Sequence, residues 1–139
     1  MKMKKNRKIT CPYCGAPAVL REGSYVYGER SKGELLYVCV NYPKCDAYVG
    51  VHRGTKRPLG TLADANLRHK RIRAHKLFDL IWKNGLMTRK EAYRWMEYFM
   101  DIPKDTGHIA NFSEYRCEVL MDKCRQTLIN NHIELPVGA

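Results

Sequence analysis

Four cysteines in the first third of the chain are the residues best suited to chemistry. Cys11 and Cys14 form one close pair in the run CPYCG, and Cys39 and Cys45 form a second pair in CVNYPKC, with 24 residues between the pairs. Two close pairs of thiolates are the donor set that Zn²⁺ takes in tetrahedral structural sites. The spacing therefore predicts one structural zinc ion bound by these four cysteines.

Two alternatives to this site concern the same part of the chain. Six cysteines in a short chain could form an extracellular disulfide framework. Residues 1–8 are basic and lack the apolar core of a secretory signal, however, so we expect a reducing cytoplasmic compartment. His52 is close enough to Cys45 in sequence to be an alternative ligand, but four cysteines already complete a closed site. We also expect no membrane association, because no run is apolar and long enough to cross a bilayer.

Short strands are predicted around the cysteine pairs, where Val, Leu and Tyr are frequent and glycines separate the runs. They are residues 18–21, 24–27, 35–40 and 47–51. Three or four antiparallel strands would form a zinc ribbon over residues 11–52, which is too small to fold without its metal. Tyr25 and Tyr27 would share one strand face, either as a stacking platform for bases or only as cover for a small core.

These motifs resemble two known families. The stretch from CPYCG to YVCVNYPKCDAYVGV is similar to the zinc ribbons at the carboxyl end of bacterial type I topoisomerases. That resemblance implies that the ribbon contacts single-stranded DNA. The longer run through GTKRPLGTLADANLRHKRIRAHKLFDLIW, TRKEAYRWM and HIANF resembles a phage and prophage family known only as a zinc-finger-containing domain of unknown function, over residues 11 to about 125. It implies a bound metal and a phage-like setting in a bacterial host cell.

The charge of the chain is concentrated in its middle. The formal net charge is +11, and residues 53–90 carry eleven basic and two acidic side chains, whereas residues 91–139 carry five and eight. A basic middle suggests a surface that binds a polyanion. Residues 1–10 form a basic arm, which could be a solubilising tail or could follow a phosphate backbone. Residues 53–60 read as a basic linker.

Helical periodicity follows the linker, and it predicts a small three-helix bundle over residues 61–131 with a tail at 132–139. The three helices are expected at 61–83, from Thr88 to a point before Pro103, and from about Asn111 to Asn130. Thr88 with Glu91 matches a capping box. The apolar stripes of the three helices contain Ala63, Leu67, Ala74, Phe78, Ile81, Ala92, Trp95, Met96, Phe99, Cys117, Leu120, Met121, Cys124 and Leu128. The fold class is thus α+β, with a zinc ribbon before a helical bundle.

Basic side chains crowd the linker and the first predicted helix. Like charges at this density destabilise an isolated helix, so we expect nucleic-acid contact, although a solvated helix face is the alternative. The predicted contacts are seven basic residues and the two ribbon tyrosines, namely Arg53, Lys56, Arg57, Arg68, Lys70, Arg71, Arg73, Tyr25 and Tyr27.

No motif for catalysis is present in the sequence. There is no Gly-rich phosphate loop and no HExxH, and Cys117 lies on an apolar stripe, so it cannot pair with His108 as a nucleophile. We therefore expect a non-enzymatic protein that binds DNA or RNA mainly through backbone phosphates. The alternative is an adaptor or inhibitor that docks on a host or phage protein.

Overall fold

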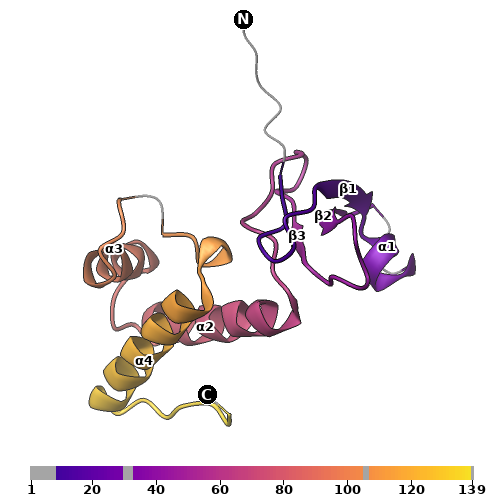
Figure 1. Ribbon diagram of the computed structural model, residues 1–139. Helices are drawn as coiled ribbons and strands as arrows, with labels where there is room; N and C mark the ends of the chain where they lie inside the picture. The colour runs from indigo at the N-terminus through magenta and orange to yellow at the C-terminus, as the bar shows by residue number, and fades with distance from the viewer. Residues whose placement is uncertain (1–8, 30–32, 105–106, 139) are drawn as a thin grey trace, which may run out of the picture. The chain divides into compact units, whose positions relative to one another are not determined.

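The computed structural model describes residues 9–29, 33–104 and 107–138. The chain divides into two units, Met1–Asn66 and Leu67–Ala139, which we call the ribbon unit and the helical unit. The arm predicted over residues 1–10 falls almost entirely outside the described residues. Figure 1 labels the helices and strands of both units.

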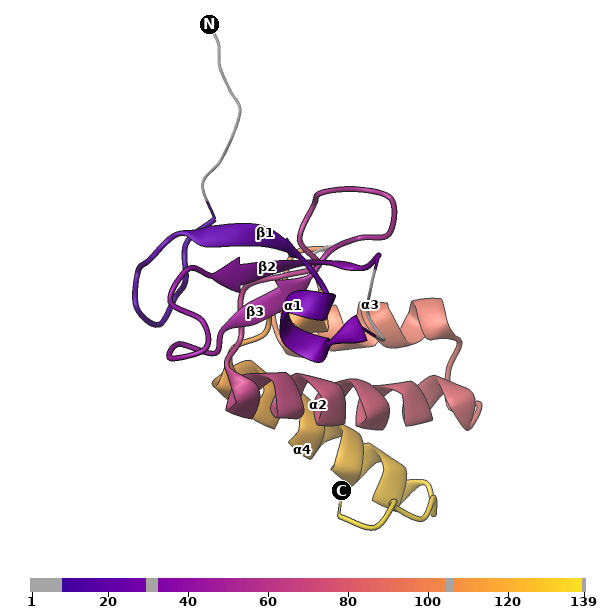
Figure 2. The same cartoon turned by 90° about the vertical axis from the view of Figure 1, so that its right-hand side faces the viewer.

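A three-stranded antiparallel sheet forms the ribbon unit. Its strands are β1 (Ala18–Glu22), β2 (Leu35–Cys39) and β3 (Tyr48–Gly50), in the spatial order β1-β2-β3. Val38 of β2 lies opposite both Val19 of β1 and Tyr48 of β3. The three strands lie side by side in Figure 2. The prediction of short antiparallel strands from Val, Leu and Tyr is confirmed.

The sheet buries side chains on both of its faces. Successive residues of a strand point to opposite faces. Accordingly, one small core contains Leu36, Val38 and Tyr48, and a second contains Cys39 and Val49. The second core is completed by residues that come from outside the strands, namely Cys11, Ala47 and Leu62. Each face of the ribbon therefore has only a handful of buried apolar side chains.

The segment Ser24–Tyr27, predicted as a strand, instead forms a single turn of helix, α1. The Tyr27 N–H donates to the Gly23 carbonyl at 2.9 Å. Gly28 then ends the turn with a φ of 85°, which glycine adopts without strain. Val26 packs on the sheet face that contains Leu36 and Tyr48. This packing outweighs the strand propensity of the Tyr-Val-Tyr run.

The segment predicted as a linker, residues 53–60, pairs back along β3. Val51 bridges Pro58, and the Leu59 N–H donates to the Gly50 carbonyl at 2.9 Å. The segment is therefore a hairpin-like loop of the ribbon unit and is not a free linker.

The first long helix, α2 (Ala65–Lys83), begins later than the predicted Thr61. Ala63 and Tyr48 exchange both backbone hydrogen bonds, at 3.0 and 3.1 Å. Because the backbone of Ala63 takes part in strand-like pairing, the helix cannot include it.

The helical unit contains the rest of α2, then α3 (Arg89–Phe99) and α4 (Glu114–Asn130). The predicted capping box at α3 is confirmed, since the Glu91 N–H donates to Thr88 Oγ1 at 3.1 Å and the Thr88 N–H donates to Glu91 Oε1 at 2.8 Å. The third predicted helix, α4, begins later than Asn111 and is capped by Ser113, because Ile109–Asn111 forms a 3₁₀ turn, η2. With α1, the described residues contain four α-helices, one more than predicted.

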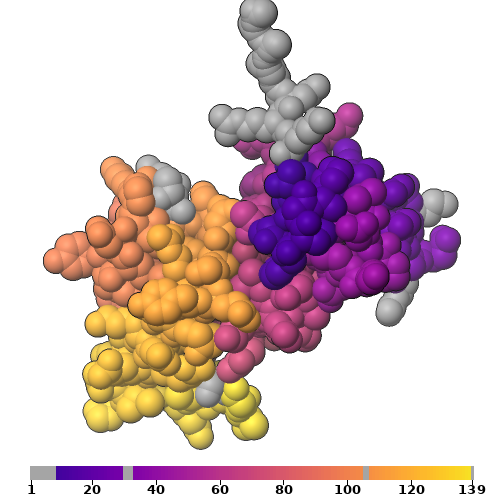
Figure 3. Space-filling view, viewed as in Figure 1, coloured from indigo at the N-terminus to yellow at the C-terminus, as the bar shows by residue number. Residues whose placement is uncertain are grey.

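The buried apolar residues of the helical unit come mainly from the predicted apolar stripes. They are Leu67, Ala74, Leu77, Phe78, Ile81, Ala92, Met96, Ile102, Ile109, Phe112, Cys117, Leu120, Met121, Cys124 and Leu128. Figure 3 shows the surface of this unit, on which the orange to yellow residues of α3 and α4 occupy much of the visible face. In the part of the chain that the structure describes, none of the helices has the length and apolar character needed to span a membrane.

Candidate metal centre

The first cysteine pair lies on a tight turn that leads into β1. The Cys11 N–H donates to the Ala16 carbonyl at 2.8 Å, and the Gly15 N–H donates to the Cys11 carbonyl at 2.9 Å. Gly15 has a φ of 76°, a conformation in which a Cβ would be strained. This turn brings the sulfurs of Cys11 and Cys14 within 4.8 Å of one another.

The second pair lies on the turn between β2 and β3. Cys39 ends β2, and its carbonyl accepts from the Tyr42 N–H at 2.9 Å. The Cys45 N–H donates to the Asn41 carbonyl at 3.1 Å, and the Cys39 N–H donates to the Ala47 carbonyl at 3.0 Å. These backbone hydrogen bonds restrain the longer turn at both of its ends. The sulfurs of Cys39 and Cys45 therefore lie on the same side of the turn.

The four sulfurs form one cluster. All four lie within 4.8 Å of one another, with Cys11 Sγ 3.6 Å from Cys45 Sγ and Cys14 Sγ 3.4 Å from Cys39 Sγ. A regular tetrahedron with Zn–S bonds of about 2.3 Å has sulfurs about 3.8 Å apart. Disulfide-bonded sulfurs would be about 2.05 Å apart. The distances therefore fit four ligands of one zinc ion, and the predicted structural zinc site is confirmed.

Nearby donors and burial set the protonation of these thiols. The backbone N–H of Ala16, and then the Cys39 thiol and the Asn41 amide, lower the pKa of Cys14 from 9.0 to about 6. Burial raises the pKa of Cys39 to about 12. Zn²⁺ binds the thiolate form, so protons compete with the ion and metal affinity falls as the pH falls.

The site is closed to further ligands. Four thiolates fill the tetrahedral coordination of zinc and leave no position for a reactive water molecule. Among the described residues, the cluster of metal-binding side chains contains only Cys11, Cys14, Cys39 and Cys45. His52, the alternative ligand, is exposed and lies outside it. The zinc is structural, and its role is to join the two turns of the ribbon.

Three of the predicted nucleic-acid contacts lie in the loop that follows β3. Arg53, Lys56 and Arg57 are exposed, and none of them forms an ion pair with a described residue. The loop is internally bonded, since the His52 N–H donates to the Arg57 carbonyl at 2.9 Å and Thr55 Oγ1 donates to the His52 carbonyl at 2.8 Å. The structure thus brings these three cations together on one internally hydrogen-bonded loop.

The basic residues predicted on α2 are placed differently. Arg71 is only 9 % exposed, and its Nε donates to the Phe112 carbonyl at 2.9 Å. Lys70 Nζ lies 3.3 Å from Glu118 and 3.9 Å from Glu114. Arg71 is therefore a packing residue and is not available to phosphate, and Lys70 is paired within the helical unit.

Two further basic residues of α2 complete the predicted set. Arg68 is half-buried and has a partner within the protein, whereas Arg73 is exposed. Of the four predicted contacts on α2, only Arg73 is therefore exposed.

The two predicted tyrosines do not share a strand face, because both belong to α1. Tyr25 is 48 % exposed and its ring lies 5.7 Å from that of Tyr42, with the Arg21 guanidinium 4.7 Å above it. Tyr27 is 50 % exposed and its ring meets that of Tyr48 edge-on at 5.6 Å. They are partly exposed members of an aromatic cluster that also covers the sheet.

Sequence reasoning missed two polar residues near the site. Asn41 lies in the turn between the second pair of cysteines, and its Nδ2 donates to Cys14 Sγ at 3.6 Å. Asp46 accepts from the N–H of Ala65, the first residue of α2, at 3.3 Å. An amide within a cysteine turn is a local signal for such a contact, whereas no local signal connects Asp46 to Ala65.

The two remaining cysteines are expected to be inert. Cys117 and Cys124 are fully buried on α4, and burial raises the pKa of both, that of Cys124 to about 12. Folding thus favours the neutral thiols. Their contribution to the stability of the folded state is complete below the unfolded pKa of 9.0 and is lost as the pH rises toward 12.

Alkylation tests the burial of these two cysteines. At about pH 8, below the ordinary thiol pKa, iodoacetamide should modify neither cysteine in the native zinc-bound protein and both after denaturation, as read by mass spectrometry. Rapid native modification of either would contradict this burial.

The chain matches a protein family described as a zinc-finger-containing domain over residues 7–127, which is most of its length and includes all four zinc ligands. Searches among curated proteins and among solved structures found no match.

Proposed function

The chain belongs to the zinc-finger-containing domain family, and we propose that it is a nucleic-acid-binding protein that holds DNA or RNA mainly through backbone phosphates. The zinc ribbon is the platform for this binding and the protein is not an enzyme. The closed thiolate site supports this proposal, because it stabilises the fold and offers no open coordination position. The phage or prophage setting implied by sequence resemblance stays an expectation.

The observation that carries the proposal is the cationic loop of residues 52–57. Its three exposed cations, Arg53, Lys56 and Arg57, form no ion pair with any described residue, so their charge is not neutralised by the protein's own carboxylates. Phosphate contacts of this kind supply most of non-specific nucleic-acid affinity.

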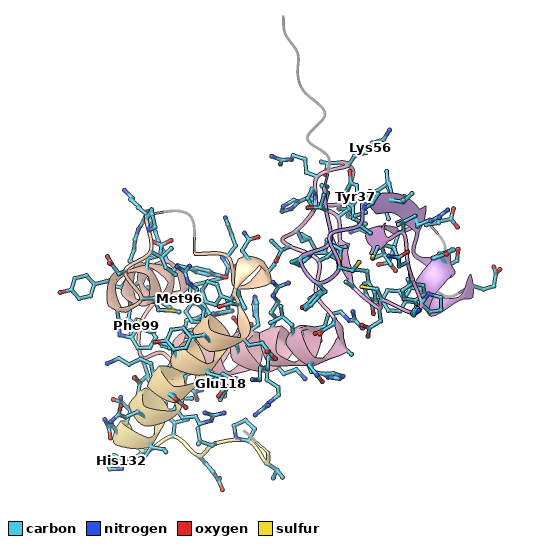
Figure 4. All side chains as sticks on the ribbon, viewed as in Figure 1. Tyr37, Lys56, Met96, Phe99, Glu118 and His132 are labelled. Atoms are coloured by element: carbon cyan, nitrogen blue, oxygen red, sulfur yellow. The ribbon has the colours of Figure 1, made fainter. Side chains whose placement is uncertain are left out.

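Hydrogen bonds connect the cationic loop to the sheet. Tyr37 Oη donates to the Lys56 carbonyl at 2.6 Å, and these two residues lie close together in Figure 4. Val51 and Pro58 bridge the base of the loop. A loop restrained by such contacts loses less conformational entropy on binding, so more of the phosphate attraction appears as affinity.

An open groove of about 1110 Å³ lies beside the cationic loop. Arg53 and Lys56 line it together with the exposed side chains of Leu35 and Leu59, and Glu34 is the acidic residue of its lining. Cationic and apolar side chains in one groove suit a nucleic-acid strand, because its phosphates can contact the cations while its sugars or bases lie against the leucines. Tyr25 and Tyr27 offer further partly exposed rings on the same unit.

Replacing the three loop cations tests the proposal. The triple variant Arg53→Gln, Lys56→Gln, Arg57→Gln should lower affinity for a labelled oligonucleotide at least about tenfold at low salt, because it removes three phosphate contacts. Each lost contact should also reduce the slope of log K against log salt by about one unit. Fluorescence anisotropy with single- and double-stranded DNA and RNA, from low to moderate salt, measures both quantities.

A charge-matched control separates the site from net charge. Arg116→Gln, Lys123→Gln, Arg125→Gln removes the same charge from α4, in which three basic and three acidic residues balance, and it should change affinity far less. Absence of salt-dependent binding to every nucleic acid would overturn the proposal. A protein partner that stays bound at a fixed stoichiometry after nuclease treatment would then favour the adaptor alternative.

A further inference from the structure

A second cationic groove lies along one face of α3 in the helical unit. Its volume is about 680 Å³, and the α3 residues that line it are Arg89, Lys90, Tyr93, Arg94 and Glu97. Positions three, four and eight apart on a helix lie on one side, so the first two turns of α3 present their cations together. His108 adds a further ring nitrogen to the lining. None of these residues was among the predicted nucleic-acid contacts.

The groove keeps a net positive charge, because its carboxylate is already engaged. Glu97 is only 7 % exposed. Its Oε1 lies 3.5 Å from Arg94 Nη1, and its Oε2 accepts from the Gly107 N–H at 3.3 Å. Arg89 and Lys90 form no ion pair with a described residue. The nearby Glu91 is occupied by the capping box at Thr88.

Aromatic rings hold Arg89 in place without neutralising it. Its guanidinium lies 5.0 Å from the centre of the Tyr93 ring and 5.9 Å from that of Trp82, and its Nη2 donates to Tyr93 Oη at 3.5 Å. The Tyr93 ring is itself fixed edge-on against Phe78 at 4.8 Å. A guanidinium supported in this way keeps N–H donors for a bidentate contact, which suits phosphate.

From this arrangement we infer that the α3 groove is a second phosphate-binding site for nucleic acid, with Arg89 and Lys90 as its contacts. The inference rests on the proposed function, in which the ribbon binds the same class of polyanion. One nucleic-acid chain bound at both units gains affinity because the second contact is intramolecular. Charge complementarity favours a polymer with a phosphate on every residue over a peptide with scattered carboxylates.

The test uses the full zinc-bound chain and the double variant Arg89→Gln, Lys90→Gln. Both residues are exposed in the first turn of α3, where removing positive charge does not weaken a helix, so the variant should fold. Its affinity for a long oligonucleotide should fall about three- to thirtyfold, with the salt slope reduced by about one to two units. The matched control Lys123→Gln, Arg125→Gln should leave both nearly unchanged.

Amide chemical shifts distinguish failure of the groove from failure of the ribbon. Titration of the wild-type chain with the oligonucleotide should move the amides of Arg89, Lys90 and Tyr93 as well as those of the cationic loop. If only the amides of the cationic loop shifted and the Arg89→Gln, Lys90→Gln variant bound like wild type, the phosphate site in the α3 groove would be overturned and the proposed function would stand. Shifts at α3 alone would support the groove and overturn the role of the ribbon. Shifts at α3 with poly-glutamate but not with the oligonucleotide would overturn the nucleic-acid assignment.

Discussion

Replacing Cys39 with Ser is expected to abolish zinc binding and unfold the ribbon unit while α3 and α4 stay folded. The two small cores of this unit contain five and three buried residues. Structural zinc in comparable small modules contributes about 10–16 kcal/mol of apparent binding free energy at neutral pH, so such cores cannot replace it. Zinc content should fall from one per chain to none, and two-dimensional amide spectra should lose dispersion for residues of the ribbon unit only.

The matched control for this change is Cys117→Ser. Cys117 is as buried as Cys39 but belongs to α4, far from the sulfur cluster in sequence and outside it in space. The variant should keep one zinc per chain, although a buried hydroxyl will lower the stability of the helical unit. A Cys39→Ser protein that retained zinc and a dispersed ribbon spectrum would contradict the proposed role of the metal.

Replacing Arg71 with Met is expected to destabilise the helical unit by about 2–4 kcal/mol. The change removes the Arg71 guanidinium, which donates to the Phe112 carbonyl. This carbonyl is buried and would lose that hydrogen bond. A buried acceptor without its donor costs about 1–3 kcal/mol, and the charge of the guanidinium makes this hydrogen bond stronger than a neutral one. Urea unfolding followed by helical circular dichroism measures the effect.

The neighbouring Arg73 provides the comparison. It is exposed on the same helix, and Arg73→Gln should change stability by no more than about 0.5 kcal/mol. If the two variants had equal stability, the packing role assigned to Arg71 would be wrong.

The zinc site and the cap of α3 could be predicted because their signals are local. Each cysteine pair lies within a single turn, so ligand type and spacing specify the site without knowledge of the tertiary fold. The capping box of Thr88 and Glu91 is likewise contained in four residues. Local signals of this kind are read from the chain directly.

The elements that could not be predicted depend on partners distant in sequence. The run Ser24–Tyr27 has strand composition, but contact with the sheet makes it helical. Residues 53–60 look like a linker until the pairing of Val51 with Pro58 and of Ala63 with Tyr48 is known. Propensity is a weak guide where tertiary contacts compete with it.

The burial of Arg71 follows from its position in the helical period. Arg71 is four residues after Leu67 and three before Ala74, so it falls on the predicted apolar stripe of α2. Its charge suggested a solvent-facing role, whereas its position in the period placed it inside. Position was the better guide, because an arginine can be buried when its donors reach a backbone carbonyl.

Zinc X-ray absorption on freshly purified, reduced protein tests the central claim most directly. We predict one zinc per chain with four sulfur neighbours at about 2.3 Å and no nitrogen neighbour. A nitrogen ligand, which would point to His52, or protein free of zinc with its ribbon still folded, would contradict the account.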